Sequence, residues 1–237
     1  MTKRVIILIL VFSRQLVISQ TTILQCLQLK DSLLGKHIYG EISPTKTFID
    51  TKNGYYETFN LETDEKGKVT KHIVLFQATI FINADTTITL ATTAYKADEQ
   101  CDWHETNFYE ISKNRAGIKK INAKSILPQL NWESSLVTVK AKTLIKKYLP
   151  QIKKQYLDST ATLNTAINEI YNTHFLLPKK GADVKMTLTT CDYIPRNIGI
   201  ITPKDWEIIT GNLQSVKLRY NKNQKKFTLS NSKKQSF

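Results

Sequence analysis

Antiparallel strand patterns between Lys71 and Ile121 constrain the fold of this chain more than any other feature. Ile73–Ile82 is almost entirely apolar or small, which is typical of a strand covered on both faces. In Thr87–Tyr95, Ile88 and Leu90 alternate with threonines, the period of a half-buried strand with high β-propensity. Two shorter strands are predicted at residues 107–111 and 117–121. Short polar turns join these segments, so we expect them to pair in meander order.

An Asn53-Gly54 pair precedes this run and adds a hairpin to it. Residues 46–51 and 55–61 flank the pair and have strand character. Asn-Gly tolerates the positive φ values of a type I′ turn, a common connection in tight hairpins. With this hairpin the sheet is expected to contain roughly five or six strands.

A helical region follows at about Lys142–Phe175. Its apolar positions fall three, four and seven residues apart and form one stripe: Ile145, Leu149, Ile152, Tyr156, Leu163, Ile167 and Ile170. Pro150 cannot sit inside a helix without a kink, and Asp158-Ser159-Thr160 is a favourable N-cap sequence. The pattern therefore predicts either two consecutive helices or one bent helix, packed on a sheet.

Strand character returns after the helical region. Residues 184–188 alternate between apolar and polar side chains, and residues 216–220 oppose residues 227–229 across a turn. Residues 21–34 have the pattern of either a short helix or a lead-in strand. The fold class predicted is α+β: an antiparallel β-meander sheet, a long helical segment packed on one face, and a C-terminal β-hairpin that extends or joins the sheet.

The chain divides into a β-rich half, residues 20–124, and a second half, residues 125–237, that holds the helical region and the last strands. We expect the two halves to share one domain. If they are separate, the break lies near residues 123–140.

The first nineteen residues have the features of a signal peptide. Lys3 and Arg4 precede eight apolar residues, and Val17-Ile18-Ser19 matches the small-residue rule for cleavage after Ser19. The apolar run is too short to span a membrane, since a spanning helix needs about 20 residues. We therefore expect a periplasmic or secreted mature chain without a transmembrane span. The alternative is that this segment forms a short N-terminal strand or helix of the core.

Export changes how the three cysteines are interpreted. Cys101 and Cys191 share a local context, because each follows a threonine-rich strand and precedes Asp and an aromatic residue. In an oxidising compartment we expect these two to form a disulfide bond. Cys26 is then free, or it pairs between chains.

Residues 98–110 contain the densest cluster of reactive side chains. Asp102, His104 and Glu105 are candidates for general acid–base catalysis if their environments separate their pKa values. A solvated acidic loop has the same composition. Cys101-x-x-His104 lacks a second ligand pair, so no metal site is predicted. The chain has no phosphate-binding glycine-rich loop and no dinucleotide fingerprint, so no cofactor is predicted either.

The formal net charge of +14 belongs mainly to the second half. Residues 20–124 contain 13 Lys/Arg and 13 Asp/Glu, a difference of zero, whereas residues 125–237 contain 18 and 7, a difference of +11. Such an excess attracts acidic partners, although scattered lysines also serve solubility alone. The candidate binding surface is the basic side of the helical region together with five residues of the C-terminal hairpin: Lys217, Arg219, Lys222, Lys225 and Lys226.

These observations favour an exported, non-enzymatic binding or structural module of the cell envelope. Trp103 and Tyr193, held together by the Cys101–Cys191 bond, would offer an aromatic surface, unless both rings pack over the disulfide. The acidic partner would be an envelope polymer, a membrane surface or a protein. Nucleic acid is disfavoured, because an exported protein seldom meets it. The alternative function is an envelope-directed hydrolase that uses Asp102, His104 and Glu105.

Overall fold

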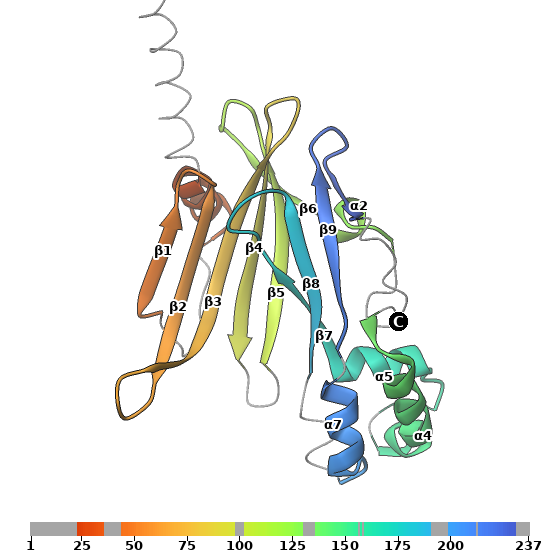
Figure 1. Ribbon diagram of the computed structural model, residues 1–237. Helices are drawn as coiled ribbons and strands as arrows, with labels where there is room; N and C mark the ends of the chain where they lie inside the picture. Colours follow the sequence, from red (N-terminus) through yellow and green to blue (C-terminus); the bar gives the residue numbers. More distant parts are fainter. Residues whose placement is uncertain are drawn as a thin grey trace, which may run out of the picture.

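Two antiparallel sheets, with helices at one end and on one face, make up the described chain (Figure 1). The structure is a computed structural model and describes residues 23–35, 44–97, 102–129, 136–155, 157, 159–190, 199–211 and 213–230. The α+β class and the antiparallel meander are confirmed. Within these ranges, no helix is both long enough and apolar enough to cross a membrane.

The first sheet has six strands in sequence order, so each strand pairs with the next along the chain. Its strands are β1 (Lys46–Asp50), β2 (Tyr55–Thr63), β3 (Val69–Ile82), β4 (Ile88–Ala97), β5 (Asp102–Ile111) and β6 (Ile118–Ile121). The local turns of the meander determine this order. The strand predicted at residues 107–111 begins earlier than expected, because β5 starts at Asp102.

The hairpin around Asn53-Gly54 is confirmed, but its connection differs from the expected type I′ turn. β1 and β2 pair from Asp50 and Tyr55, so four residues, 51–54, connect them. Gly54 has a φ of +65° and Asn53 does not have a positive φ. The Asp50 carboxylate instead accepts hydrogen bonds from the main-chain and side-chain nitrogens of Asn53, at 3.0 and 2.7 Å. A side chain at Gly54 would meet Ile80, because a Cβ there would clash with Cγ1 of Ile80.

The second sheet has four strands in the order β10-β9-β8-β7. Its strands are β7 (Tyr171–Leu176), β8 (Asp183–Thr190), β9 (Ser215–Asn221) and β10 (Lys226–Leu229). The C-terminal hairpin is confirmed, with Phe227 opposite Tyr220, but it belongs to this separate sheet. The predicted helix through Phe175 was wrong, because Tyr171–Leu176 pairs with β8 as a strand.

The helical region consists of two consecutive helices. These are α4 (Val139–Gln155) and α5 (Leu163–Ile170). Two further helices are α2 (Ala123–Ile126) and α7 (Pro203–Gly211). Pro150 lies inside α4, and Thr162 caps α5 by accepting from Thr165 N at 3.2 Å. Figure 1 shows α4, α5 and α7 gathered at one end of the second sheet.

The two faces of the first sheet pack against different partners. Residues 23–34 form a helix whose Ile23 and Cys26 pack with Ala78 and Leu90 on one face. The other face faces the second sheet. The core between the two sheets contains residues from both halves of the chain: Tyr55, Phe81, Phe108, Ile145, Tyr171, Leu218 and Phe227. The period-two alternation of β3 and β4 therefore sends consecutive side chains into two separate cores.

Candidate functional site

The predicted acid–base residues do not converge. His104 and Glu105 are neighbours in β5, so they point to opposite faces of the sheet. Glu105 lies opposite Ala94, which packs in the core beneath the N-terminal helix, and it accepts a hydrogen bond from Asn107 at 3.0 Å. The main chain of Asp102 belongs to β5, but its side chain lies outside the described atoms. The side chains of His104 and Glu105 therefore cannot act on one substrate from the same face of β5, as they could have done in a loop.

His104 instead takes part in an aromatic contact between the two sheets. Its ring stacks on His174 of β7, with centroids 3.6 Å apart and planes 13° apart, and Tyr95 lies edge-on at 5.4 Å. Burial, followed by the neighbouring His104, lowers the pKa of His174 to about 3. His174 is therefore neutral at physiological pH. The sequence gives no signal for this contact, because His174 lies 70 residues away from His104 along the chain.

The aromatic and disulfide predictions remain predictions. Cys101, Cys191 and Tyr193 lie outside the described residues, as does the side chain of Trp103. Cys26 belongs to the N-terminal helix and is buried against the first sheet, and this burial raises the pKa of its thiol to about 11. No group of three or more His, Cys, Asp or Glu side chains that could hold a metal occurs in the part of the chain that the structure describes.

A cavity of about 420 Å³ lies beside Cys26, between the N-terminal helix and the β5–β6 turn. It is lined by Gln25, Cys26, Gln28, Leu29, Ser32, Ile111 and Arg115. The Arg115 guanidinium donates to Gln25 Oε1 at 2.5 Å. A thiol with a raised pKa is mostly protonated near neutral pH, so this cavity does not provide an activated nucleophile.

The outer face of the second sheet carries most of the predicted binding residues. Lys217 and Arg219 alternate with the half-buried Val216 and the buried Leu218, so both cations point away from the core. Lys185 lies opposite Lys217 and was missed by the sequence reasoning. We define the basic face as five exposed residues: Lys185, Lys217, Arg219 and Lys226 on the strands, and Lys222 in the turn between β9 and β10.

Asp183 is the carboxylate that this face contains among the described residues. Arg219 donates to its two oxygens at 2.7 and 3.1 Å, and Lys217 Nζ lies 2.6 Å from Oδ2. These two cations hold the pKa of Asp183 well below its usual range. Five cations accompany one carboxylate, so the face remains strongly positive.

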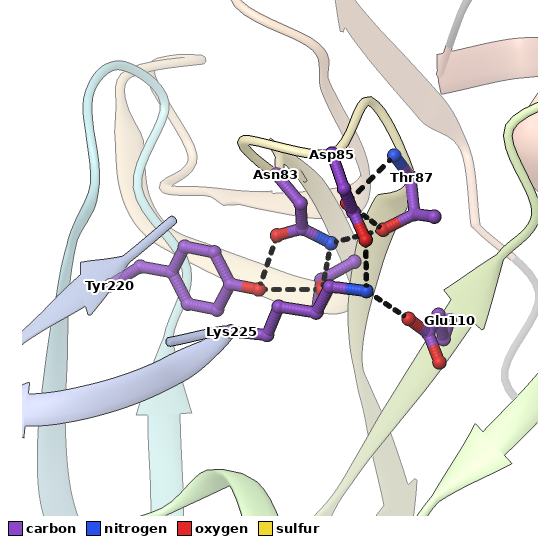
Figure 2. Close-up of polar contacts among 7 residues, drawn as sticks. Asn83, Asp85, Thr87, Glu110, Tyr220 and Lys225 are labelled. Atoms are coloured by element: carbon purple, nitrogen blue, oxygen red, sulfur yellow. Dashed lines mark hydrogen bonds and ion pairs between the residues drawn. The ribbon is translucent and has the colours of Figure 1, made fainter. Parts of the chain in front are cut away.

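Lys225 differs from the other predicted binding residues, because it anchors the hairpin to the first sheet. Figure 2 shows its ammonium between Asp85 and Glu110, at 2.7 and 2.6 Å. Both carboxylates raise the pKa of Lys225. The hydroxyl of Tyr220 donates to Asn83 Oδ1 at 2.7 Å and also lies 2.6 Å from Thr89 Oγ1. Lys225 is thus engaged within the chain and is not included in the basic face.

A buried carboxylate on β2 was also missed. Glu57 is 1% exposed and lies on the inner face of the first sheet, in an otherwise aromatic alternation with Tyr55 and Phe59. A charged residue at an inward position of a strand was the signal that could have revealed it. His72 Nε2 and Lys179 Nζ approach Glu57 Oε1 at 3.3 and 3.4 Å. One buried carboxylate thus contacts the ionisable side chains of Tyr55, His72 and Lys179.

A scan against models of known protein families finds no match. A search of curated proteins finds no match either. Among solved structures, the chain is similar to the structure of a domain of an uncharacterized protein from Porphyromonas gingivalis W83, with 10% sequence identity and a TM-score of 0.44. That similarity covers 88% of this chain and 98% of the other. The functional proposal therefore rests on the geometry of the described residues.

Proposed function

We propose that this protein is an exported, non-enzymatic binding or structural module of the cell envelope that engages an acidic partner through the basic face. The supporting observation is a grouping of five exposed cations near Asp183: four lie on the outer side of β8, β9 and β10, and Lys222 lies in the turn between β9 and β10. The predicted hydrolase draws no comparable support, because His104 and Glu105 point to opposite sides of β5.

The shape of the basic face favours a repeating polyanion over an isolated anion. Neighbouring strands lie roughly 5 Å apart, and alternate residues along a strand lie roughly 7 Å apart. Lys185 and Lys217 are cross-strand neighbours, whereas Lys217 and Arg219 are alternate residues of β9. Charges spaced in this way can contact successive acidic groups of an extended polymer at once. An envelope polymer rich in carboxylates or phosphates has this chemistry.

We expect a triple variant of the basic face, Lys185→Gln with Lys222→Gln and Lys226→Gln, to lose most polyanion binding. Each exposed lysine contributes about 0.5–1 kcal/mol, so the affinity for polyglutamate should fall roughly 10- to 100-fold. Fluorescence anisotropy with labelled polyglutamate measures this loss. For the unchanged protein, the affinity should also weaken at least tenfold between about 50 and about 200 mM salt.

The matched control removes three exposed lysines from α4: Lys140→Gln, Lys146→Gln and Lys154→Gln. Both triple variants change the net charge equally, so only the location of the lysines differs. Equal losses of affinity would show that total charge matters, and the basic face would lose its role. Anionic vesicles provide a second arm, in which binding tighter than to polyglutamate would favour a membrane surface over a polymer.

Export of the protein predicts a disulfide bond between Cys101 and Cys191. Asp102 at the start of β5 and Thr190 at the end of β8 are the described neighbours of these cysteines, and both strand ends lie at the same end of the molecule in Figure 1. Mass spectrometry of unreduced peptides from natively exported protein should find the two cysteines linked, with Cys26 as a free thiol. A free thiol at Cys101 in that material would contradict the expectation.

A further inference from the structure

The ammonium group of Lys179 lies among Phe48, Tyr55 and Glu57 on the first sheet. Its Nζ lies 5.0 Å from the centre of the Phe48 ring and 5.6 Å from that of Tyr55. The same nitrogen is 3.4 Å from Glu57 Oε1. We propose that Phe48, Tyr55 and Glu57 form a binding site for a primary alkylammonium group of a ligand, and that Lys179 occupies this site until the ligand displaces it.

The carboxylate of Glu57 requires a cation at this position. A buried charge is retained only when it is paired and hydrogen-bonded. The Tyr55 hydroxyl donates to Oε2 of Glu57, and Gln77 Nε2 donates to the same oxygen at 3.2 Å. These neutral donors satisfy one oxygen. The other oxygen, Oε1, faces the partly exposed side chains of His72 and Lys179.

Lys179 is a loosely held occupant of the site. Its distance of 3.4 Å from Glu57 exceeds the 2.6–2.7 Å of the ion pairs made by Lys217 and Lys225. Charge-assisted hydrogen bonds are normally about 2.7–2.9 Å long. The side chain of Lys179 is 56% exposed and follows the end of β7 at Leu176. Its departure would therefore leave the pairing of β7 with β8 intact.

The two rings add an attraction for cations that the ion pairs of the basic face lack. A cation within about 6 Å of a ring centre is drawn to its negative face, and this attraction contributes about 0.5–1 kcal/mol at exposed sites. Phe48 is 41% exposed on the edge strand β1, so a ligand can reach it. Tyr55 is fully buried, and its ring centre lies 6.2 Å from that of Phe48.

The contact with Glu57 also determines which cation fits. A primary ammonium group can donate hydrogen bonds to Oε1 while its charge faces the rings. A quaternary ammonium keeps the attraction to the rings but has no hydrogen to donate. We therefore expect the site to prefer alkylammonium groups, such as a free diamine or the side chain of a lysine in another polypeptide.

Titration with n-butylammonium, followed by two-dimensional NMR of the full chain, tests the site. We expect saturable shifts at Phe48 and Tyr55 in the unchanged protein. In Lys179→Ala the affinity should rise roughly tenfold, because the ligand no longer competes with the resident ammonium. The matched control, Lys180→Ala, removes an adjacent exposed lysine and should leave the affinity unchanged.

Two further arms separate the contributions of the rings and the carboxylate. Phe48→Ala, added to Lys179→Ala, should weaken binding roughly two- to fivefold through loss of the ring attraction. Tetramethylammonium should bind Lys179→Ala at least roughly fivefold more weakly than n-butylammonium, since it cannot donate to Glu57. Cadaverine and a blocked lysine peptide then compare the two sources of the group, and binding of either supports the site.

Two results would overturn the proposal. Absence of shifts at Phe48 and Tyr55 in Lys179→Ala would show that no ammonium site exists there. Binding by Lys179→Ala without any binding by the unchanged protein would show that the site serves only Lys179. The altered residues are exposed, and spectra without ligand establish that each variant is folded. The basic face lies on the other sheet, so the polyanion test is independent of this one.

Discussion

Replacement of Phe81 by alanine is expected to lower the free energy of unfolding by about 3–5 kcal/mol, a large share of the stability of a typical domain. Phe81 is 5% exposed and projects from β3 toward the second sheet. Its ring stacks on Tyr220 with centroids 4.6 Å apart and meets Phe227 edge-on at 5.4 Å. The deletion would leave a cavity where the two sheets meet.

Urea denaturation followed by tryptophan fluorescence measures this change. Phe48→Ala is the matched control, because it deletes the same atoms from a ring that is 41% exposed on β1. We expect that control to cost less than about 1 kcal/mol. Similar losses for the two variants would mean that the contact between the sheets contributes little, and that the C-terminal hairpin is held mainly by the polar network of Figure 2.

Acidification is expected to destabilise the protein through His174. In the unfolded chain a histidine has a pKa of about 6.5, whereas burial lowers the pKa of His174 in the fold to about 3. Between these values the unfolded chain binds the additional proton. The stability contributed by the neutral ring is therefore complete above about pH 6.5 and declines as the pH falls toward 3.

Because of this proton binding, the free energy of unfolding should be about 2 kcal/mol lower at about pH 5 than at about pH 7.5. Denaturant midpoints measured across this range give the slope. His174→Phe keeps an aromatic ring against His104 but cannot be protonated, so its pH dependence should be shallower by that amount. An identical slope in the variant would show that His174 is readily protonated within the fold.

Local patterns were sufficient to predict the strands of the meander. β3 contains an almost continuous apolar run and β4 alternates with a period of two, and short turns leave each strand next to its predecessor. The C-terminal hairpin was predicted for the same reason, since Tyr220 and Phe227 alternate with polar neighbours. In both cases the information lies within a few residues of the element itself.

The predicted helical region was extended too far, to Phe175, because helix and strand patterns overlap after Ile170. Ile167 and Ile170 belong to α5, and the following apolar positions, Tyr171 and Phe175, also fit a helical spacing. Tyr171–Leu176 is a strand because it pairs with β8, and a pattern within the segment does not reveal this later partner. Intrinsic preference is weak compared with the hydrogen bonds and burial that such pairing provides.

The same division between local patterns and long-range contacts applies to the candidate sites. The sequence by itself determined the class of the fold, the meander order and the position of the basic residues in the second half. Only the tertiary structure decided that His104 meets His174, that Lys225 is neutralised by Asp85 and Glu110, and that Glu57 is buried beside Lys179. The physical reason is that periodicity records which face of an element is buried, whereas the partner that covers this face depends on contacts between residues distant in the chain.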